Sequence, residues 1–142
     1  MKTTIFGAGA VGGHLAARLG AAGADVSAVV RGAQLAAIHE RGLALHIADE
    51  RYHARIRATD RPEELGEQDL VMVTVKSSVL PELASSIATL VGPDTSVVFA
   101  MNGIPWWYLY RAQTTAPAPD LSRLDPTARW RARSATSGSS AA

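Results

Sequence analysis

Three glycines near the N-terminus have a spacing that is typical of phosphate binding. The run Gly7-Ala8-Gly9-Ala10-Val11-Gly12 fits G-x-G-x-x-G, follows the strand-like run Thr3 to Phe6 and opens an apolar helical pattern. The first glycine allows a tight turn, the second a close backbone approach to a pyrophosphate, and the third close packing of helix and strand. The N–H groups at the helix start and the helix dipole then attract the anion. We therefore predict that these six residues bind a dinucleotide; the alternative is a glycine-rich turn that binds nothing.

The residue after the second predicted strand bears on which dinucleotide is bound. NAD-binding domains usually carry Asp or Glu there for the ribose 2′-hydroxyl, whereas NADP-binding domains need a cation for the 2′-phosphate. This sequence has Arg31 at that position, and Asp25 stands at the opposite end of the same strand. A guanidinium can pair with two phosphate oxygens at once and stack on the adenine. We predict NADP(H), with NAD(H) or a merely solvated arginine as the alternatives.

Two further polar residues follow buried strands. Lys76 comes directly after the apolar run that ends at Val75, and Asn102 follows the run that ends at Met101. Ligands of an open α/β sheet lie beyond the carboxyl ends of the strands, so both residues would face the cofactor. Lysine can donate to a ribose hydroxyl, and asparagine can hydrogen-bond a nicotinamide, a ribose or a substrate. The alternatives are a solvated lysine and an ordinary Asn-Gly turn.

The composition excludes several classes of function. The chain has 142 residues, of which 47% are hydrophobic and 19% charged, and its net charge is +1. This small charge argues against nucleic-acid or membrane partners held by electrostatics, and no apolar run is long enough to span a membrane. The absence of cysteine excludes disulfides and thiol chemistry and suits a reducing cytoplasm. The absence of cysteine leads us to predict a cytoplasmic protein. The four histidines lack carboxylate partners at metal-ligand spacing, so we predict no metal site.

Strands and helices alternate along most of the chain. We predict strands at residues 3–6, 25–30, 69–75 and 95–100, the last two buried, and helices at residues 10–22, 32–40 and 79–90. A hairpin is predicted from residues 43–47 and 52–58, joined by residues 48–51, and a further helix start is predicted at Asp60 as its cap. This alternation predicts an α/β fold, a doubly wound parallel sheet of the Rossmann type, over residues 1–110.

Residues 111–142 differ in composition from the rest of the chain. They carry five arginines and two aspartates, are rich in Ala, Ser, Thr and Pro, and contain no Ile, Val, Phe, Met or Tyr. A segment of this kind buries too little apolar surface to offset the entropy cost of ordering it. We therefore predict a boundary near Tyr110 and a low-complexity, disordered tail.

Four segments together resemble a known enzyme family. They are GAGAVGGHLAARL, VVRGAQLAAIHERGL, VTVKS and MNGIPWWY, in this order and at matching spacing up to about residue 110. They resemble the N-terminal domain of 2-dehydropantoate 2-reductase (ketopantoate reductase), a family that reduces a 2-oxo acid with NADPH in pantothenate biosynthesis. The resemblance implies that Gly7 to Gly12 bind the pyrophosphate and that Arg31 binds the adenosine 2′-phosphate. It also implies that Lys76 contacts the cofactor and that Asn102 contacts both nicotinamide and substrate.

The resemblance does not extend to the family's catalytic groups. The family's proton-donating lysine and a substrate-holding glutamate lie in a helical C-terminal domain, and residues 111–142 contain neither Lys nor Glu. We assign no catalytic residue and expect little or no turnover from this chain alone. Three hypotheses follow: the cofactor domain of an NADPH-dependent 2-oxo-acid reductase, an NADP(H)-binding module without catalysis, and a remnant that self-associates through Ile104 to Tyr108.

We hypothesise a genetic origin for the change of composition after Tyr110. The family pattern is predicted to stop after Tyr108, and a reading-frame change or a truncated gene would explain that. A family match that continues in the same frame would contradict a frame change.

Overall fold

The computed structural model describes residues 1–102. The predicted boundary at Tyr110, the self-association segment Ile104 to Tyr108 and the tail at residues 111–142 lie outside this range and stay predictions. The described residues divide between two compact units. One consists of residues 1–76 and 85–101 and contains every strand; residues 77–84 and Asn102 belong to the other.

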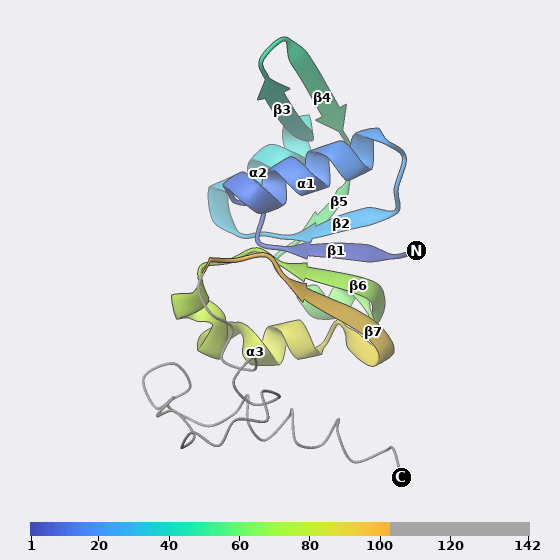
Figure 1. The fold of residues 1–142 in the computed structure, drawn as a ribbon, viewed down its shortest axis with the longest axis vertical. Coiled ribbons are helices and arrows are strands. Elements are labelled where there is room, and N and C mark those ends of the chain that lie inside the picture. The colour runs from blue at the N-terminus through green and yellow to red at the C-terminus, as the bar shows by residue number, and fades with distance from the viewer. Residues whose placement is uncertain (103–142) are drawn as a thin grey trace, which may run out of the picture. The chain divides into compact units, whose positions relative to one another are not determined.

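Five parallel strands form the sheet that carries the predicted loop. They are β1 (Thr3–Phe6), β2 (Val26–Val29), β5 (Arg57–Thr59), β6 (Gln68–Val73) and β7 (Val91–Phe99), in the spatial order β5-β2-β1-β6-β7 (Figure 1). Counted along the sheet's own strands, this is the order 3-2-1-4-5 of a Rossmann fold, so the predicted fold class is confirmed. The strand order reverses between β1 and β6, and ligands of such sheets bind at that point.

Helix α1 (Ala10–Ala21) contacts β1 and β2 and also a separate hairpin, β3 (Leu43–Ile47) and β4 (Glu50–Ala54) (Figure 1). One core cluster joins Ile5, Ala16 and Val26 from these elements, and all three are nearly inaccessible to solvent. A second cluster includes Ile38 of α2 (Gly32–Arg41), which contacts β5. The apolar periodicity of both helices thus faces the cores that hold the loop between β1 and α1.

The hairpin differs from its prediction in two ways. Its loop is only two residues long, with Ala48 at a φ of 48°, so β4 begins at Glu50 rather than at Tyr52. The predicted strand at residues 52–58 is wrong as one element, because β4 ends at Ala54 and β5 joins the main sheet beside β2. Ile56, between them, packs into both cores, which turns the chain from one sheet to the other.

Two contacts strengthen the hairpin and its attachment to α1. The Tyr52 hydroxyl donates to the Glu50 carboxylate at 2.6 Å, and this hydrogen bond raises the pKa of Tyr52. The guanidinium carbon of Arg18, on α1, lies 5.1 Å from the centre of the Tyr52 ring, a distance suited to a cation–π contact.

Two other local predictions are corrected. The helix predicted to start with Asp60 as its cap is a 3₁₀ turn, η1 (Pro62–Leu65), and its cap residue is Arg61. The N–H of Arg61 donates to the Thr59 hydroxyl at 3.0 Å. The strand predicted as buried at residues 95–100 is β7, which forms an edge of the sheet and leaves Val98 44% exposed. It pairs with β6 on one side, and no strand among residues 1–102 pairs with its outer edge. The helix predicted at residues 79–90 is α3 (Leu80–Ala88), preceded by the short η2 (Ser77–Val79).

A buried polar network crosses the three central strands. The hydroxyl of Thr4 on β1 lies 2.7 Å from the hydroxyl of Ser27 on β2 and donates at 3.0 Å to the side-chain oxygen of Gln68 on β6. The amide of Gln68 then donates to the carbonyl oxygen of Leu65 at 3.0 Å. Because these groups are buried and paired, the network favours one register for the three strands.

We expect Thr4→Val to lower the free energy of unfolding by about 1–3 kcal/mol, because it leaves buried groups of Ser27 and Gln68 without their partner. Urea unfolding of the full chain measures this change. Thr3→Val is the matched control, since Thr3 is also buried and, within residues 1–102, only its carbonyl oxygen and not its hydroxyl takes part in a side-chain hydrogen bond. Equal losses in the two variants would contradict a specific role for the network.

Candidate dinucleotide-binding site

The glycine loop connects β1 to α1, and two of its glycines are required by the fold itself. Gly7 has a φ of 98°, and a Cβ there would lie 2.5 Å from Cγ1 of Val75. A Cβ at Gly12 would overlap the carbonyl oxygen of Gly7 and the Thr74 hydroxyl. Larger side chains at either position would displace the loop from the strand ends. The tight turn and the close helix–strand packing expected from the sequence are therefore present.

Gly9 has a different environment. It caps α1 with a φ of −68°, is exposed, and a Cβ added to it would meet no atom within 4 Å. Neither steric crowding nor a left-handed conformation within residues 1–102 explains a glycine at this position. Open space above the backbone is what close approach of a pyrophosphate requires.

The start of α1 is suited to an anion. Ala10 and Val11 are exposed, whereas Ala8 is buried in the core below the loop. No side chain of the described residues caps this helix end, and its first turn has no acidic residue. The N–H groups of the first turn lack helical partners and carry the positive end of the helix dipole. All six predicted loop residues thus lie together at one exposed helix start.

Arg31 lies at the carboxyl end of β2, beside the loop. The N–H of Gly7 donates to the Val29 oxygen at 3.0 Å, and the N–H of Val30 donates to the Thr59 oxygen at 2.9 Å. These bonds join the loop, β2 and β5 directly before Arg31. Arg31 itself is exposed at the N-cap of α2 and forms no ion pair within the described range. Its guanidinium is therefore available to an anionic ligand.

Lys76 follows the strand on the other side of the loop. The N–H of Thr74 donates to the Phe6 oxygen at 3.0 Å, which joins the ends of β6 and β1 two residues before Lys76. Lys76 is exposed, and no hydrogen bond or ion pair engages its ammonium within residues 1–102. Asn102 is also exposed, three residues after β7, and it belongs to the other compact unit. Its predicted contact with cofactor and substrate stays a prediction.

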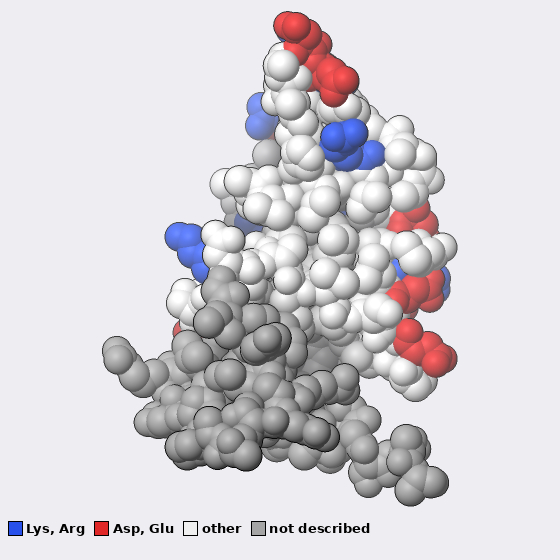
Figure 2. Space-filling model, in the orientation of Figure 1, with Lys and Arg blue, Asp and Glu red and all other residues white. Residues whose placement is uncertain are grey.

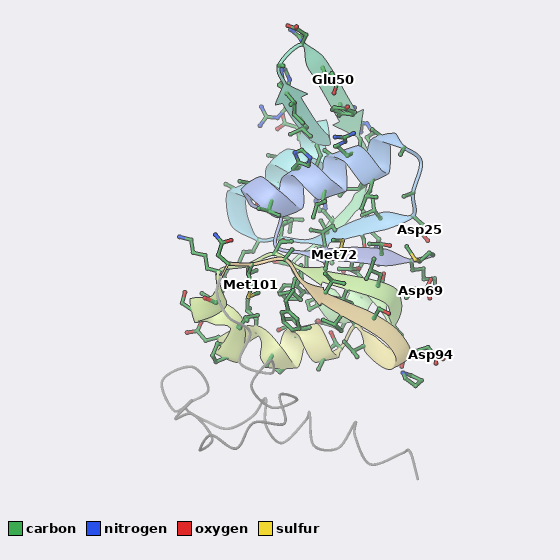
Figure 3. All side chains as sticks on the ribbon, in the orientation of Figure 1. Asp25, Glu50, Asp69, Met72, Asp94 and Met101 are labelled. Carbon is green, nitrogen blue, oxygen red and sulfur yellow. The ribbon has the colours of Figure 1, made fainter. Side chains whose placement is uncertain are left out.

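Charge is distributed unevenly between the two ends of the sheet. Asp25 and Asp69 lie at the end where the strands begin, and Figure 3 labels both there, with Met101 at the opposite end. Acidic atoms gather on the same side of the molecule in Figure 2, which has the same orientation. Arg31 and Lys76 follow the carboxyl ends of β2 and β6, while Asp60 follows the edge strand β5. The ends nearest the loop therefore carry the cations that phosphates need.

Two residues that the sequence reasoning missed contact the loop directly. The Gln34 amide, from the first turn of α2, donates to the carbonyl oxygen of Ala8. The Thr74 hydroxyl lies 3.2 Å from the Phe6 oxygen and also donates to the carbonyl oxygen of Gly7. The only signal in the sequence was their closeness to Arg31 and Lys76.

The described residues contain neither a metal-binding cluster nor a membrane-spanning helix. Residues 1–102 hold no group of three or more His, Cys, Asp or Glu side chains arranged to bind a metal ion. Over the same range, no helix combines the length and hydropathy needed to cross a bilayer.

Comparison with known proteins assigns the family. A family model described as ketopantoate reductase PanE/ApbA matches residues 3–106. The chain belongs to the ketopantoate reductase family. A 2-dehydropantoate 2-reductase of Mesorhizobium japonicum is 46% identical over 127 residues, which are 89% of this chain and 39% of that protein. The resemblance seen in the four sequence segments is thereby confirmed.

Solved structures agree with the family assignment. A protein of Ralstonia solanacearum MolK2, named as a member of the ketopantoate reductases, is 44% identical with a TM-score of 0.82, over 90% of this chain and 40% of that one. A D-mandelate dehydrogenase solved with NADH and anilino(oxo)acetate is 28% identical with a TM-score of 0.66, over 74% of this chain and 34% of that one. The chain thus spans about 40% or less of the length of these relatives.

The same comparison corrects one prediction about the tail. Only 110 residues precede the predicted boundary, so a match covering 127 residues continues past Tyr110 in the same reading frame. A frame change directly after Tyr110 is therefore wrong. The unusual composition of residues 111–142 has no explanation in the described structure.

Proposed function

We propose that this chain is the cofactor-binding part of an NADPH-dependent reductase that acts on a 2-oxo acid. The observation that supports the proposal is the open helix start at Gly9, which no side chain of the described residues caps, together with the cations that follow β2 and β6. Gly7 to Gly12 would hold the pyrophosphate, Arg31 the 2′-phosphate, and Lys76 a ribose hydroxyl. NADPH supplies a hydride to the carbonyl carbon of the acid when bound.

The residues of this chain have binding and orienting roles in that reaction. The loop N–H groups donate hydrogen bonds that stabilise the negative charge of the pyrophosphate, and the cations at the strand ends fix the direction in which the dinucleotide lies. Asn102 is proposed to hydrogen-bond the nicotinamide end and the substrate. Protonation of the product oxygen requires a donor that we do not assign to any residue of this chain, so we propose binding without appreciable turnover.

NAD(H) is the second candidate cofactor, because the related D-mandelate dehydrogenase was solved with NADH. The name of that neighbour, a D-mandelate dehydrogenase, also differs from that of a 2-dehydropantoate reductase, so the 2-oxo acid of this chain is left unspecified in the proposal. Arg31 is the feature of this chain that favours NADP(H), since a guanidinium matches a phosphate far better than a ribose hydroxyl.

Fluorescence titration of the full chain with NADPH and NADH tests the proposal, with Arg31→Ala as the informative variant. We expect the wild type to prefer NADPH and Arg31→Ala to weaken NADPH binding about tenfold, the loss of one charge-assisted hydrogen bond, without changing NADH binding. Arg41→Ala, at the other end of α2, is the matched control and should bind like wild type. Equal loss of both cofactors in Arg31→Ala would contradict its contact with the 2′-phosphate.

A further inference from the structure

Two consecutive carbonyl groups of the glycine loop are held by side chains from different elements. Thr74, directly after β6, donates its hydroxyl to the oxygen of Gly7, and Gln34, in the first turn of α2, donates its amide to the oxygen of Ala8. Within residues 1–102 these are the hydrogen bonds that the two oxygens accept from side chains. Ala8, between them, is 3% exposed.

Peptide geometry turns these two bonds into a constraint on the loop. In a planar trans peptide, the carbonyl of one residue and the N–H of the next point in opposite directions. Holding the oxygens of Gly7 and Ala8 against the protein therefore turns the N–H groups of Ala8 and Gly9 away from Thr74 and Gln34. It also fixes the peptide that leads into the exposed start of α1.

We propose that Thr74 and Gln34 are positioning residues for the cofactor: they orient the loop so that its N–H groups meet a pyrophosphate. The proposal rests on the proposed dinucleotide-binding function. It differs from the role of Arg31, which distinguishes NADPH from NADH, because the pyrophosphate is common to both. Loss of either hydrogen bond therefore weakens the binding of NADPH and of NADH by the same factor.

The strand ends explain why these two residues can act together. β6 lies next to β1, and its end is joined to the end of β1, directly before the loop, by the bond from the Thr74 N–H to the Phe6 oxygen at 3.0 Å. β2 lies on the other side of β1, and its end is joined to the loop by the Gly7 bond to Val29 at 3.0 Å. On the β6 side, Thr74 makes both the backbone bond and a side-chain bond to the loop. On the β2 side, the backbone bond is accepted by the Val29 oxygen and the side-chain bond comes from Gln34, which follows Val29 in the chain.

The test compares Thr74→Val and Gln34→Met, which keep the size of the side chain and remove its donor. We expect each to weaken both NADPH and NADH about 5- to 20-fold, with an unchanged NADPH-to-NADH ratio, as suits the loss of one oriented hydrogen-bond group. Adenosine 2′-monophosphate, which has no pyrophosphate, should bind as it does to wild type. A merely structural defect would weaken all three ligands together.

Two controls separate positioning from folding. Thr74→Ser keeps the hydroxyl and should have wild-type affinity. Thr89→Val removes another hydrogen bond from a threonine hydroxyl to a carbonyl, the 2.8 Å bond to the Ser86 oxygen, and should not change cofactor affinity. Wild-type affinity for both dinucleotides in Thr74→Val and Gln34→Met would overturn the positioning role alone. Failure of the unchanged chain to bind either dinucleotide would overturn the proposed function and this inference together.

Discussion

Gly12→Val is expected to destabilise the fold strongly, by about 3 kcal/mol or more. A Cβ at this position would overlap the Gly7 carbonyl oxygen and the Thr74 hydroxyl and lie 3.0 Å from Cγ2 of Ile5. Backbone and core atoms cannot move aside as an exposed side chain can, so β1 and α1 must separate. A loss of this size is a large share of the stability of a domain of this length.

Thermal unfolding of the full chain measures the effect, and we expect Tm to fall by more than about 10 °C. Gly13→Ala is the matched control in the same helix, because its Cβ would come no closer than 3.2 Å to any neighbour, the Ala8 oxygen. We expect that variant to change Tm by only a few degrees, since alanine also favours the helix. A Tm for Gly12→Val within the range of the control would show that the loop does not need this close packing.

The sequence was sufficient for the loop and the sheet because each carries a local signature. Gly7 and Gly12 stand where a turn and a close contact demand glycine, and the apolar run of β6 is typical of a central parallel strand. The prediction for Arg31 rests on the same kind of signal, its place after β2. These features depend on the backbone and on neighbours along the chain, which a sequence displays directly.

The rest depends on contacts between distant segments. The alternating pattern of residues 52–58 predicts one strand and does not show which strand it pairs with. In the structure β4 pairs with β3 and β5 pairs with β2, and Ile56 between them packs into both cores. The apolar β7 predicts a buried strand, although no strand among residues 1–102 covers its outer edge. Thr74 and Gln34 have no pattern of their own, since their partners are carbonyl oxygens of the loop.

Gly9→Val is expected to remove cofactor binding while leaving the fold intact. A Cβ at Gly9 meets no atom within 4 Å, so the added methyl groups cost the protein little and project into the space above the loop. A pyrophosphate bound to the first turn of α1 would have to move away from the N–H groups that hold it. We expect both NADPH and NADH to bind at least about 30-fold more weakly, because several charge-assisted hydrogen bonds are lost together.

Fluorescence titration and thermal unfolding on the same preparation distinguish this result from that of Gly12→Val. Tm should stay within a few degrees of wild type, so the loss of binding cannot come from unfolding. Ala21→Val, at the opposite and exposed end of α1, is the control for adding a branched side chain to this helix. Wild-type cofactor binding by Gly9→Val would mean that the pyrophosphate lies elsewhere. A fall in Tm like that of Gly12→Val would mean that the fold, rather than a ligand, accounts for the glycine at position 9.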